Sequence, residues 1–477
     1  MIPTGLLHRP PRPVGAAARA AATVLAAAGL AGCASMAPSY ERPAPPVAAS
    51  YPGAPASDAA AAAAADIEWQ RFFVDPRLKR LVEVALQNNR DLRIATLSVQ
   101  RVQAQYQIQR AERFPSVTLG ATGLVEPESP GSGTNAYYTA GLNITGYELD
   151  LFGRVRSLGD AALQQYFASE EARKAAHISL VAAVASTYLA LLADDEQLAL
   201  ARQTLQTRER SLELLQLRFD NGVASRYDHA QAQSLVEGAR AALALLQRQR
   251  EQSRNALELL LGQPLPADLP PGLPLQAQGL LADLPAGLPS ALLERRPDVR
   301  QAEHQLQAAN ANIGAARAAF FPRITLTASA GFASEDLGGL FENRAWQFAP
   351  RITLPIFDAG ANRANLEVSQ TTRDIALAQY ERSIQVAFRE VADSLAARAT
   401  LGEQLRAQRA QAQAEETRYR LADLRYQNGA ASYLDVLDAQ RALFLVQQGV
   451  IIAQATQWQN LVTLYKVLGG GWKDAAN

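Results

Sequence analysis

The side chains that could do chemistry form no catalytic or metal-binding group. The 477-residue chain has no G-x-S-x-G motif and no phosphate-binding loop, and its single cysteine cannot form an internal disulfide. The 46 basic and 46 acidic residues cancel, and the basic ones are dispersed, which argues against a nucleic-acid partner. The four histidines lack metal-ligand spacing and lie at His8, His177, His229 and His304. We therefore predict that the protein is not an enzyme and binds no metal, nucleic acid or soluble cofactor.

Two acidic turns repeat at a fixed offset. Residues 218–233 read RFDNGVASRYDHAQAQ and residues 425–440 read RYQNGAASYLDVLDAQ, so the copies start 207 residues apart (425 against 218). In each copy Asn-Gly suits a left-handed helix end, and the serine three residues after the glycine suits a helix N-cap. Asp228 and Asp435 follow these serines by three residues, which is typical of a capping box. Capping is a sufficient explanation for these two acids, and a further role stays open.

Asp438 has no such explanation. Its counterpart in the first copy, 207 residues earlier (438 against 231), is Gln231. Asp438 follows Asp435 by three residues, so both carboxylates share one face of a helix. In a symmetric oligomer the pair would form two rings of acids, which resist joint ionisation and attract cations. The alternative is an ordinary solvated aspartate.

Long proline-free stretches predict two very long helices. No proline lies between Pro130 and Pro264, and none follows Pro355. A proline inside a helix costs about 3 kcal/mol, so these stretches favour uninterrupted helices. They predict helices over 154–219 and 362–427, each about 100 Å long at ~1.5 Å per residue. Such lengths suit a structure that crosses the periplasm rather than a compact core.

Shorter helices flank the two long ones. Returning helices are predicted to end at Leu261 and Leu468, and the Gly469–Gly471 run that follows indicates a helix end rather than a nucleotide loop. Helices over 78–113 and 291–320 should stop at the Phe-Pro pairs. The first long helix has apolar positions that we expect to need partner helices from outside the chain, namely Leu180, Val184, Leu191 and Leu198.

Four short segments predict barrel strands. They alternate between apolar and small polar residues and span 115–121, 138–144, 324–330 and 348–356. Aromatic residues gather near their ends, as in membrane-interface girdles. We predict loops beyond the membrane at 126–136 and 334–345, and place Pro355 at a strand exit. A soluble hairpin with one buried face is the alternative. Four strands cannot enclose a channel, because even the interior of an eight-stranded barrel is filled by side chains. We therefore expect three copies to form one barrel of twelve strands.

The first residues predict export and a lipid anchor. Arg9, Arg12 and Arg19 precede the short apolar segment 20–31, which is too short to span a membrane. The segment leads into Leu-Ala-Gly-Cys, which resembles a bacterial lipobox and implies cleavage before Cys33 and acylation of that residue. Under the same resemblance, Ala34 implies sorting to the outer membrane. A proline- and alanine-rich stretch follows, and we predict that it is an extended linker lying along the surface.

Three motifs carry a resemblance to a known family. They are residues 292–326, 354–366 (LPIFDAGANRANL) and 465–472 (YKVLGGGW). They resemble the TolC/OprM-type outer-membrane efflux family, in its lipoprotein branch that serves RND-type exporters. The resemblance implies a homotrimer in the Gram-negative outer membrane, in which a transmembrane β-barrel continues into an α-helical barrel in the periplasm. It also implies a periplasmic membrane-fusion adaptor and an inner-membrane RND-type pump as partners.

The resemblance implies a passive exit duct for small molecules, and the motifs favour the multidrug branch of the family. A duct for protein secretion and a periplasmic coiled-coil adaptor lipoprotein are the alternatives. The predicted domains are a signal peptide (1–32), an anchor and tether (33–77), a first efflux repeat (78–263), a proline-rich equatorial linker (264–290), a second repeat (291–469) and a tail (470–477). The linker should form an equatorial collar together with residues 68–75 and Trp472.

The resemblance also assigns roles to residues at the two turns. Asp435 and Asp438, with Leu434, match the periplasmic constriction that closes the resting channel. Tyr426, Arg441 and Asp228 match positions that tie the inner helix pair to the outer one. This chain has Ala431 where some relatives place a basic residue, which puts one closing ion pair in doubt. The adaptor is expected to dock on the hairpin tips at Asn221, Gly222, Asn428 and Gly429.

Overall fold

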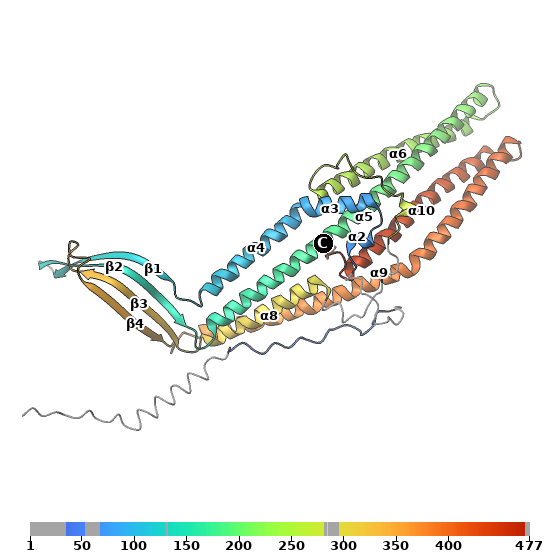
Figure 1. Cartoon of the computed structure of the whole chain (residues 1–477). Coiled ribbons are helices and arrows are strands. Elements are labelled where there is room, and N and C mark those ends of the chain that lie inside the picture. Colours follow the sequence, from blue (N-terminus) through green and yellow to red (C-terminus); the bar gives the residue numbers. More distant parts are fainter. Residues whose placement is uncertain (1–34, 53–66, 130–131, 281–283, 285–294, 473–477) are drawn as a thin grey trace, which may run out of the picture. The chain divides into compact units, whose positions relative to one another are not determined.

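The computed structural model describes residues 35–52, 67–129, 132–280, 284 and 295–472 (Figure 1). The chain divides into two compact units. Of the described residues, the sheet unit contains those in 35–42, 101–167 and 304–378, and the hairpin unit contains those in 43–100, 168–303 and 379–472. The predicted signal peptide and Cys33 lie outside the described residues, as does part of the linker 264–290.

The sheet unit contains one antiparallel sheet in the order β1-β2-β3-β4. Its strands are β1 (Val117–Ser129), β2 (Ser132–Leu149), β3 (Arg323–Ser334) and β4 (Arg344–Thr353). Side chains alternate between the two faces, as strand geometry requires. Leu119 pairs with Leu142 and Ala328 pairs with Phe348 on the apolar face. Thr122 pairs with Thr139 on the other, and their hydroxyls hydrogen-bond at 2.7 Å.

The apolar face of the sheet is uncovered within the chain. Leu119 and Trp346 are each 81% exposed, and Ile352 is 69% exposed. A soluble hairpin would bury this face, because exposed contiguous apolar surface of this kind is rare in soluble proteins. The alternation therefore indicates strands that face lipid on one side.

The strands are longer than predicted. The expected loop at 126–136 was wrong, since the ladder continues to the pair Ser129–Ser132. Backbone pairing continues on both strands past the predicted strand ends. The loop at 334–345 is confirmed to within two residues, with Pro355 just beyond the end of β4. Pro350 lies inside β4, which is an edge strand of the sheet within one chain, where a missing N–H is tolerated.

The two long helices lie where the proline-free stretches predicted them. They are α5 (Arg154–Asp220) and α9 (Ala361–Gln427), each of 67 residues. The returning helices are α6 (Arg226–Leu261) and α10 (Tyr433–Val467). Gly262 (φ 70°) follows α6, and Gly469 (φ 86°) stops α10 as predicted, since both adopt the left-handed conformation that glycine favours.

The two flanking helices depart from the prediction. The expected helix 78–113 is two helices, α3 (Pro76–Asn88) and α4 (Arg90–Ala111). The break lies at Asn89, whose side-chain oxygen accepts a hydrogen bond from Leu92 N (2.9 Å) and whose amide donates to Leu260 O (2.9 Å). The helix expected over 291–320 is α8 (Pro297–Ala318), and residues 291–294 lie outside the described part of the chain. Pro297 suits the first turn of α8, where the backbone N–H has no helical partner.

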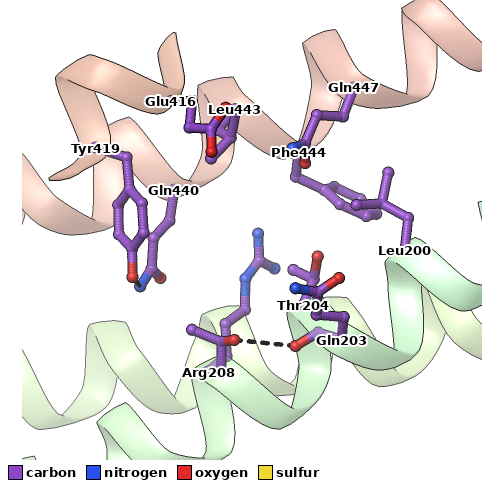
Figure 2. Close-up of a pocket in the computed structure, with 11 residues that line it drawn as sticks. Leu200, Gln203, Thr204, Arg208, Glu416, Tyr419, Gln440, Leu443, Phe444 and Gln447 are labelled. Carbon is purple, nitrogen blue, oxygen red and sulfur yellow. Dashed lines mark hydrogen bonds between the residues drawn. The ribbon is translucent and has the colours of Figure 1, made fainter. Parts of the chain in front are cut away.

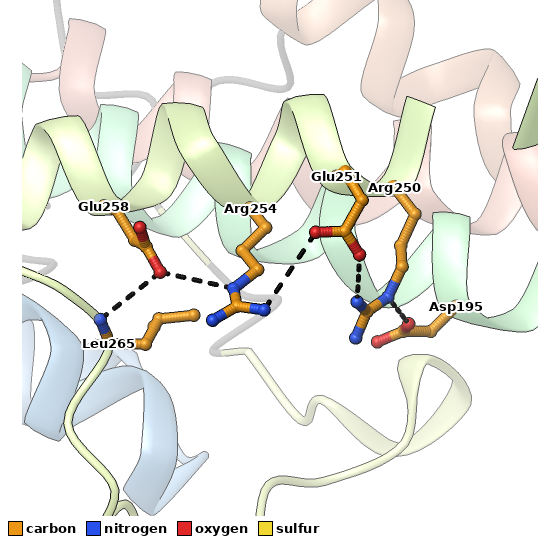
Figure 3. Close-up of polar contacts among 6 residues, drawn as sticks. All are labelled: Asp195, Arg250, Glu251, Arg254, Glu258 and Leu265. Carbon is orange, nitrogen blue, oxygen red and sulfur yellow. Dashed lines mark hydrogen bonds and ion pairs between the residues drawn. The ribbon is translucent and has the colours of Figure 1, made fainter. Parts of the chain in front are cut away.

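Within the hairpin unit, the α5/α6 and α9/α10 hairpins share an apolar cluster at their ends. Leu215 of α5 and Ala232 of α6 pack with Tyr433, Val436 and Leu437 of α10, and all five are buried. A polar network along α6 adds contacts to α5 (Figure 3). In it Arg250 donates to Asp195 of α5 (2.7 Å). Each hairpin is thus closed by contacts of its own helices and joined to the other near the turns.

The linker residues that the structure describes pack around buried Asp75. Its carboxylate accepts hydrogen bonds from the Tyr188 hydroxyl (2.9 Å), Leu273 N (3.0 Å) and Gln278 Nε2 (3.1 Å). A second buried group, Arg296, pairs with Asp298 and Glu390 and donates to a carbonyl at the end of α10. Satisfied charges of this kind hold the α3, linker and α8 segments to the long helices.

The apolar positions of α5 require a correction. Leu180, Val184 and Leu198 are buried within the chain itself, so they need no outside partner, and Leu191 is half-buried. Other apolar side chains remain uncovered, such as Leu445 (59% exposed) and Ile452 (52%) of α10. By length and composition alone, α5 and α10 could cross a membrane, but the apolar window is 50% buried in α5 and only 28% buried in α10. The case for partner helices therefore rests on α10.

The start of the tether lies along the sheet unit, as predicted for a surface-hugging linker. Residues 35–50 contain no helix or strand. Asn310 donates to Pro38 O (2.7 Å) and Arg317 donates to Met36 O (3.1 Å). Gly314 allows this approach, because an added Cβ would lie 2.6 Å from Ala37 N. The α8 surface thus hydrogen-bonds the tether backbone directly.

Candidate functional site

The two hairpin tips share the same turn geometry. Gly222 (φ 73°) and Gly429 (φ 70°) are left-handed, as predicted from Asn-Gly. The preceding asparagines each donate a side-chain hydrogen bond to the carbonyl four residues earlier, Asn221 to Leu217 O (2.6 Å) and Asn428 to Leu424 O (2.7 Å). An added Cβ at either glycine would meet nothing within 4 Å, so both tips are open.

Capping explains the first acid of each copy. Asp228 accepts a hydrogen bond from the Ser225 hydroxyl (2.6 Å), and its backbone N–H donates to that same hydroxyl (3.1 Å). Asp435 accepts from both the backbone N–H (3.1 Å) and the hydroxyl (3.0 Å) of Ser432. The capping box is confirmed at Ser432 and Asp435, whereas Ser225 and Asp228 form the N-cap without the reciprocal bond from the serine backbone.

Asp438 is held by an ion pair that the sequence analysis missed. Arg418 of α9 donates to its carboxylate at 2.5 Å and also to Glu415 at 3.1 Å. Both members of the Arg418–Asp438 pair are about half exposed. A signal was available, because each residue lies ten positions from Asn428 (418 and 438 against 428). An antiparallel hairpin that turns at Asn428 brings such positions face to face.

The predicted constriction residues share one exposed face of α10. Tyr433, Val436 and Leu437 point into the cluster with α5 and α6, and burial raises the pKa of the Tyr433 hydroxyl. The exposed positions of these turns in the single chain are Leu434, Asp435, Asp438 and Arg441. The helix therefore presents one apolar residue, two acids and one base on a single stripe.

Of the three predicted ties, Tyr426 contacts the other hairpin. The guanidinium of Arg218, in the last turn of α5, donates to the Tyr426 hydroxyl (2.5 Å) and lies 5.1 Å from the ring centroid. The Tyr426 ring also packs against that of Tyr433 at 5.0 Å. Arg218 was not among the predicted site residues.

Asp228 and Arg441 make no tie in this arrangement. The side-chain hydrogen bonds of Asp228 stay within its own cap. Arg441 forms no ion pair within 4 Å in the described part of the chain, and the charged group whose pKa it affects is Arg208 of α5. Their predicted role in the closed state remains a prediction. Across the described residues, no three His, Cys, Asp or Glu side chains converge on a point that could hold a metal.

Comparisons with known proteins agree with the repeat and the fold. The model of the outer membrane efflux protein family matches residues 81–263 and 288–470. The two matches start 207 residues apart (288 against 81), which is the offset between the turns. The chain is 49% identical over 454 residues to the antibiotic efflux pump outer membrane protein ArpC and to the toluene efflux pump outer membrane protein TtgC, both of Pseudomonas putida. Each alignment covers 93% of both chains.

A solved structure matches over the same extent. The open-state crystal structure of the MtrE outer membrane channel of Neisseria gonorrhoeae is similar with a TM-score of 0.86 and 44% sequence identity. The match covers 92% of this chain and 99% of that one.

Proposed function

The chain belongs to the outer membrane efflux protein family, and from this premise we propose that three copies form a passive exit duct with a constriction at Asp435 and Asp438. The protein is an efflux channel of the Gram-negative outer membrane and not an enzyme. Its fold combines long helices with a four-stranded membrane sheet. The finer points, namely assembly, partners, substrates and gate, are proposals.

The sheet is the main support for a trimeric barrel, because it has an exposed apolar face and two open edges, β1 and β4. An open edge in the membrane leaves backbone groups without hydrogen bonds, and a closed barrel removes every edge. Four strands are too few to enclose a channel, whereas twelve strands from three copies leave a lumen. The polar face, with Thr122 and Thr139, would line that lumen.

The partners and substrates follow from the relatives. ArpC and TtgC are named as outer membrane proteins of antibiotic and toluene efflux pumps. We propose that this chain likewise receives small apolar or amphipathic molecules from an inner-membrane pump through a periplasmic adaptor. The tips at Gly222 and Gly429 form the docking edge, since both turns are open. Acylation of Cys33 would anchor each copy to the membrane.

The gate consists of the exposed stripe on α10. In a three-fold assembly Asp435 and Asp438 would form two rings of three carboxylates around the axis. Their charge attracts cations, and the narrow ring limits flow. The Tyr426–Arg218 contact holds the α9 end against α5, so that separation of these two residues would accompany opening.

Planar-bilayer conductance tests this gate. The Asp435→Ala/Asp438→Ala double variant should conduct more than the wild type and lose part of its preference for cations. Asp423→Ala, near the end of α9, serves as the control, because its carboxylate lies outside the α10 stripe and accepts a hydrogen bond from Gln427 (2.8 Å). Unchanged conductance and ion preference in the double variant would refute the assignment.

A further inference from the structure

A cavity lies between the two hairpins, about 220 Å³ in volume, and one arginine dominates it. Arg208 of α5 is only 7% exposed, and Figure 2 shows its guanidinium directed into the space between α5 and the facing helices. Tyr419 and Glu416 of α9 and Phe444 of α10 line the opposite side. The cavity lies wholly within the hairpin unit.

The charge of Arg208 has no counter-ion among the described residues. Its one hydrogen bond runs from Nη1 to Leu235 O (3.1 Å), and its guanidinium lies 5.6 Å from the Phe444 ring centroid. Its Nε–H is buried without a partner. No carboxylate oxygen of a described residue lies within 4 Å of the guanidinium nitrogens of Arg208. Burial, and then the nearby positive charge of Arg441, lower the pKa of Arg208.

Such an arrangement is costly as it stands. A buried ion costs several kcal/mol unless an opposite charge and hydrogen bonds compensate for it. Here a second cation, Arg441, adds repulsion. Arg208 and Arg441 form no ion pair within 4 Å among the described residues, so together they create a local positive charge that an anion would neutralise.

The free edge of the guanidinium matches a specific class of anion. With Nη1 engaged by Leu235, the Nε–H and Nη2 groups remain, and this edge forms the fork that takes two oxygens of one anion. The Tyr419 hydroxyl accepts a hydrogen bond from Gln440 Nε2 (3.3 Å), which leaves its own proton to donate. Thr204 adds a second hydroxyl to the lining. At about 30 Å³ per water in the liquid, the cavity has room for an oxyanion and some water.

We infer that the cavity between the hairpins is a binding site for one small oxyanion of the sulfate or phosphate class, held by the Nε/Nη2 fork of Arg208 and the positive charge of Arg441. A bound anion would link α5 to α10, and it would stabilise the packing of the two hairpins. The inference does not depend on the proposed gate.

Glu416 provides the competing explanation. Its exposed side chain lines the same cavity and forms no ion pair within 4 Å with any residue that the structure describes. A side-chain rotation could make it the counter-ion of Arg208. The two explanations predict opposite effects for Glu416→Gln. If an external anion binds, the substitution removes a repulsive charge and tightens binding. If Glu416 is the counter-ion, the substitution destabilises the protein.

The experiment is thermal unfolding of the purified full-length protein with increasing sodium sulfate, the ionic strength being held constant with sodium chloride. The wild type should show a saturable rise in Tm above the general effect of sulfate on all proteins. Arg208→Gln should remove the saturable part. Arg208→Lys keeps the positive charge but lacks the two-nitrogen fork, and it should weaken sulfate binding on the order of 10- to 100-fold. Arg210→Gln, an exposed position two residues further along α5, should behave as the wild type.

Two results would overturn the inference. One is an identical sulfate response in the wild type, Arg208→Lys and Arg208→Gln, which would mean that the response is not specific to this site. The other is a lower Tm in Glu416→Gln together with no saturable sulfate response, which would make Glu416 the counter-ion. A tighter sulfate response in Glu416→Gln supports the site.

Discussion

Asp435 and Asp438 lie three residues apart on α10, but they have different partners. Asp435 accepts two hydrogen bonds from Ser432 and stabilises the start of the helix. Asp438 is paired with Arg418 across the hairpin at 2.5 Å. An exposed pair of this kind adds only about 0–1 kcal/mol to stability, so its main effect is on the electrostatic potential at the stripe. Arg418 thus partly neutralises the negative charge of Asp438.

Arg418→Gln should therefore increase the preference of the channel for cations. The substitution leaves three uncompensated Asp438 carboxylates in a trimer, with little change in thermal stability. Reversal potentials across planar bilayers measure the preference, and the change should shrink at high salt as the charges are screened. Arg420→Gln, an exposed position two residues further along α9, is the matched control. An equal change in both variants would show that Arg418 acts only through the overall charge.

A second acid has a consequence for pH. Burial raises the pKa of Asp194 above its ordinary value, although the Ser253 hydroxyl, which donates to it at 2.5 Å, acts in the opposite direction. With a raised pKa, the folded state holds the proton more tightly than the unfolded state. The stabilisation from this group is complete below the unfolded pKa and is lost as the pH rises through the folded pKa.

Asp194→Asn should thus gain thermal stability relative to the wild type as the pH rises from about 4 towards neutrality, and lose that advantage in acid. Thermal unfolding of the full-length protein across this range measures it. Asp220→Asn, an exposed position at the end of the same helix, is the control and should keep a Tm close to that of the wild type across the range. A stability difference between Asp194→Asn and the wild type that does not vary with pH would contradict the expectation.

At the scale of elements, the turn of each helical hairpin contains one glycine in the left-handed conformation. Gly222 and Gly429 have φ near 70°, and open space surrounds both. Any effect of substitution there comes from the backbone alone. Gly238, inside α6, is the opposite case, since it is helical and also has nothing within 4 Å of an added Cβ.

Gly429→Ala should destabilise the tip of its hairpin by about 1–2 kcal/mol, because an L-residue is strained in the left-handed region. Gly238→Ala should stabilise α6 by about 0.5–1 kcal/mol, because alanine loses less backbone entropy in a helix. Hydrogen exchange of the tip amides is the appropriate measurement, since hairpin ends open locally. Changes of the same sign in both variants would contradict the assignment of the turn.

At the scale of the whole molecule, one chain is incomplete. The sheet has two open edges, its apolar face is exposed, and α10 leaves apolar side chains such as Ile452 uncovered. Each feature calls for a neighbour of matching shape. Three copies around one axis satisfy all of them, because β4 of one copy can pair with β1 of the next.

Cysteines on both edge strands test this arrangement. A variant with Thr118→Cys on β1 and Arg351→Cys on β4 should give covalent trimers when the purified protein is treated with a flexible bis-maleimide, since neighbouring strands lie only about 4.8 Å apart. Each single-cysteine variant should give no covalent trimer, because the second linkage is missing. A double variant that stays monomeric on a denaturing gel would refute a barrel shared between copies.

Local chemistry allowed much of the fold to be predicted. The helix type follows from composition and the absence of proline, and the caps follow from Asn-Gly and Ser-x-x-Asp. The alternation in the four strands predicted their two faces. The errors came where a long-range partner overrides local preference. The loop predicted at 126–136 is mostly strand because most of its described residues find a partner across the ladder. Asn89 breaks a predicted helix by bonding to Leu260 of α6.

The candidate site divides in the same way. The sequence by itself determined the turns, the helix N-caps and the face that Asp435 and Asp438 share, because residues a few positions apart interact through fixed helix geometry. The pairing of Arg418 with Asp438 follows from their equal distance from the turn at Asn428, whereas only the tertiary structure decided that Arg218 meets Tyr426. It also decided that Arg208 points into a cavity between the hairpins. These contacts join separate helices, and their geometry depends on how the hairpins pack, a property that no local pattern encodes.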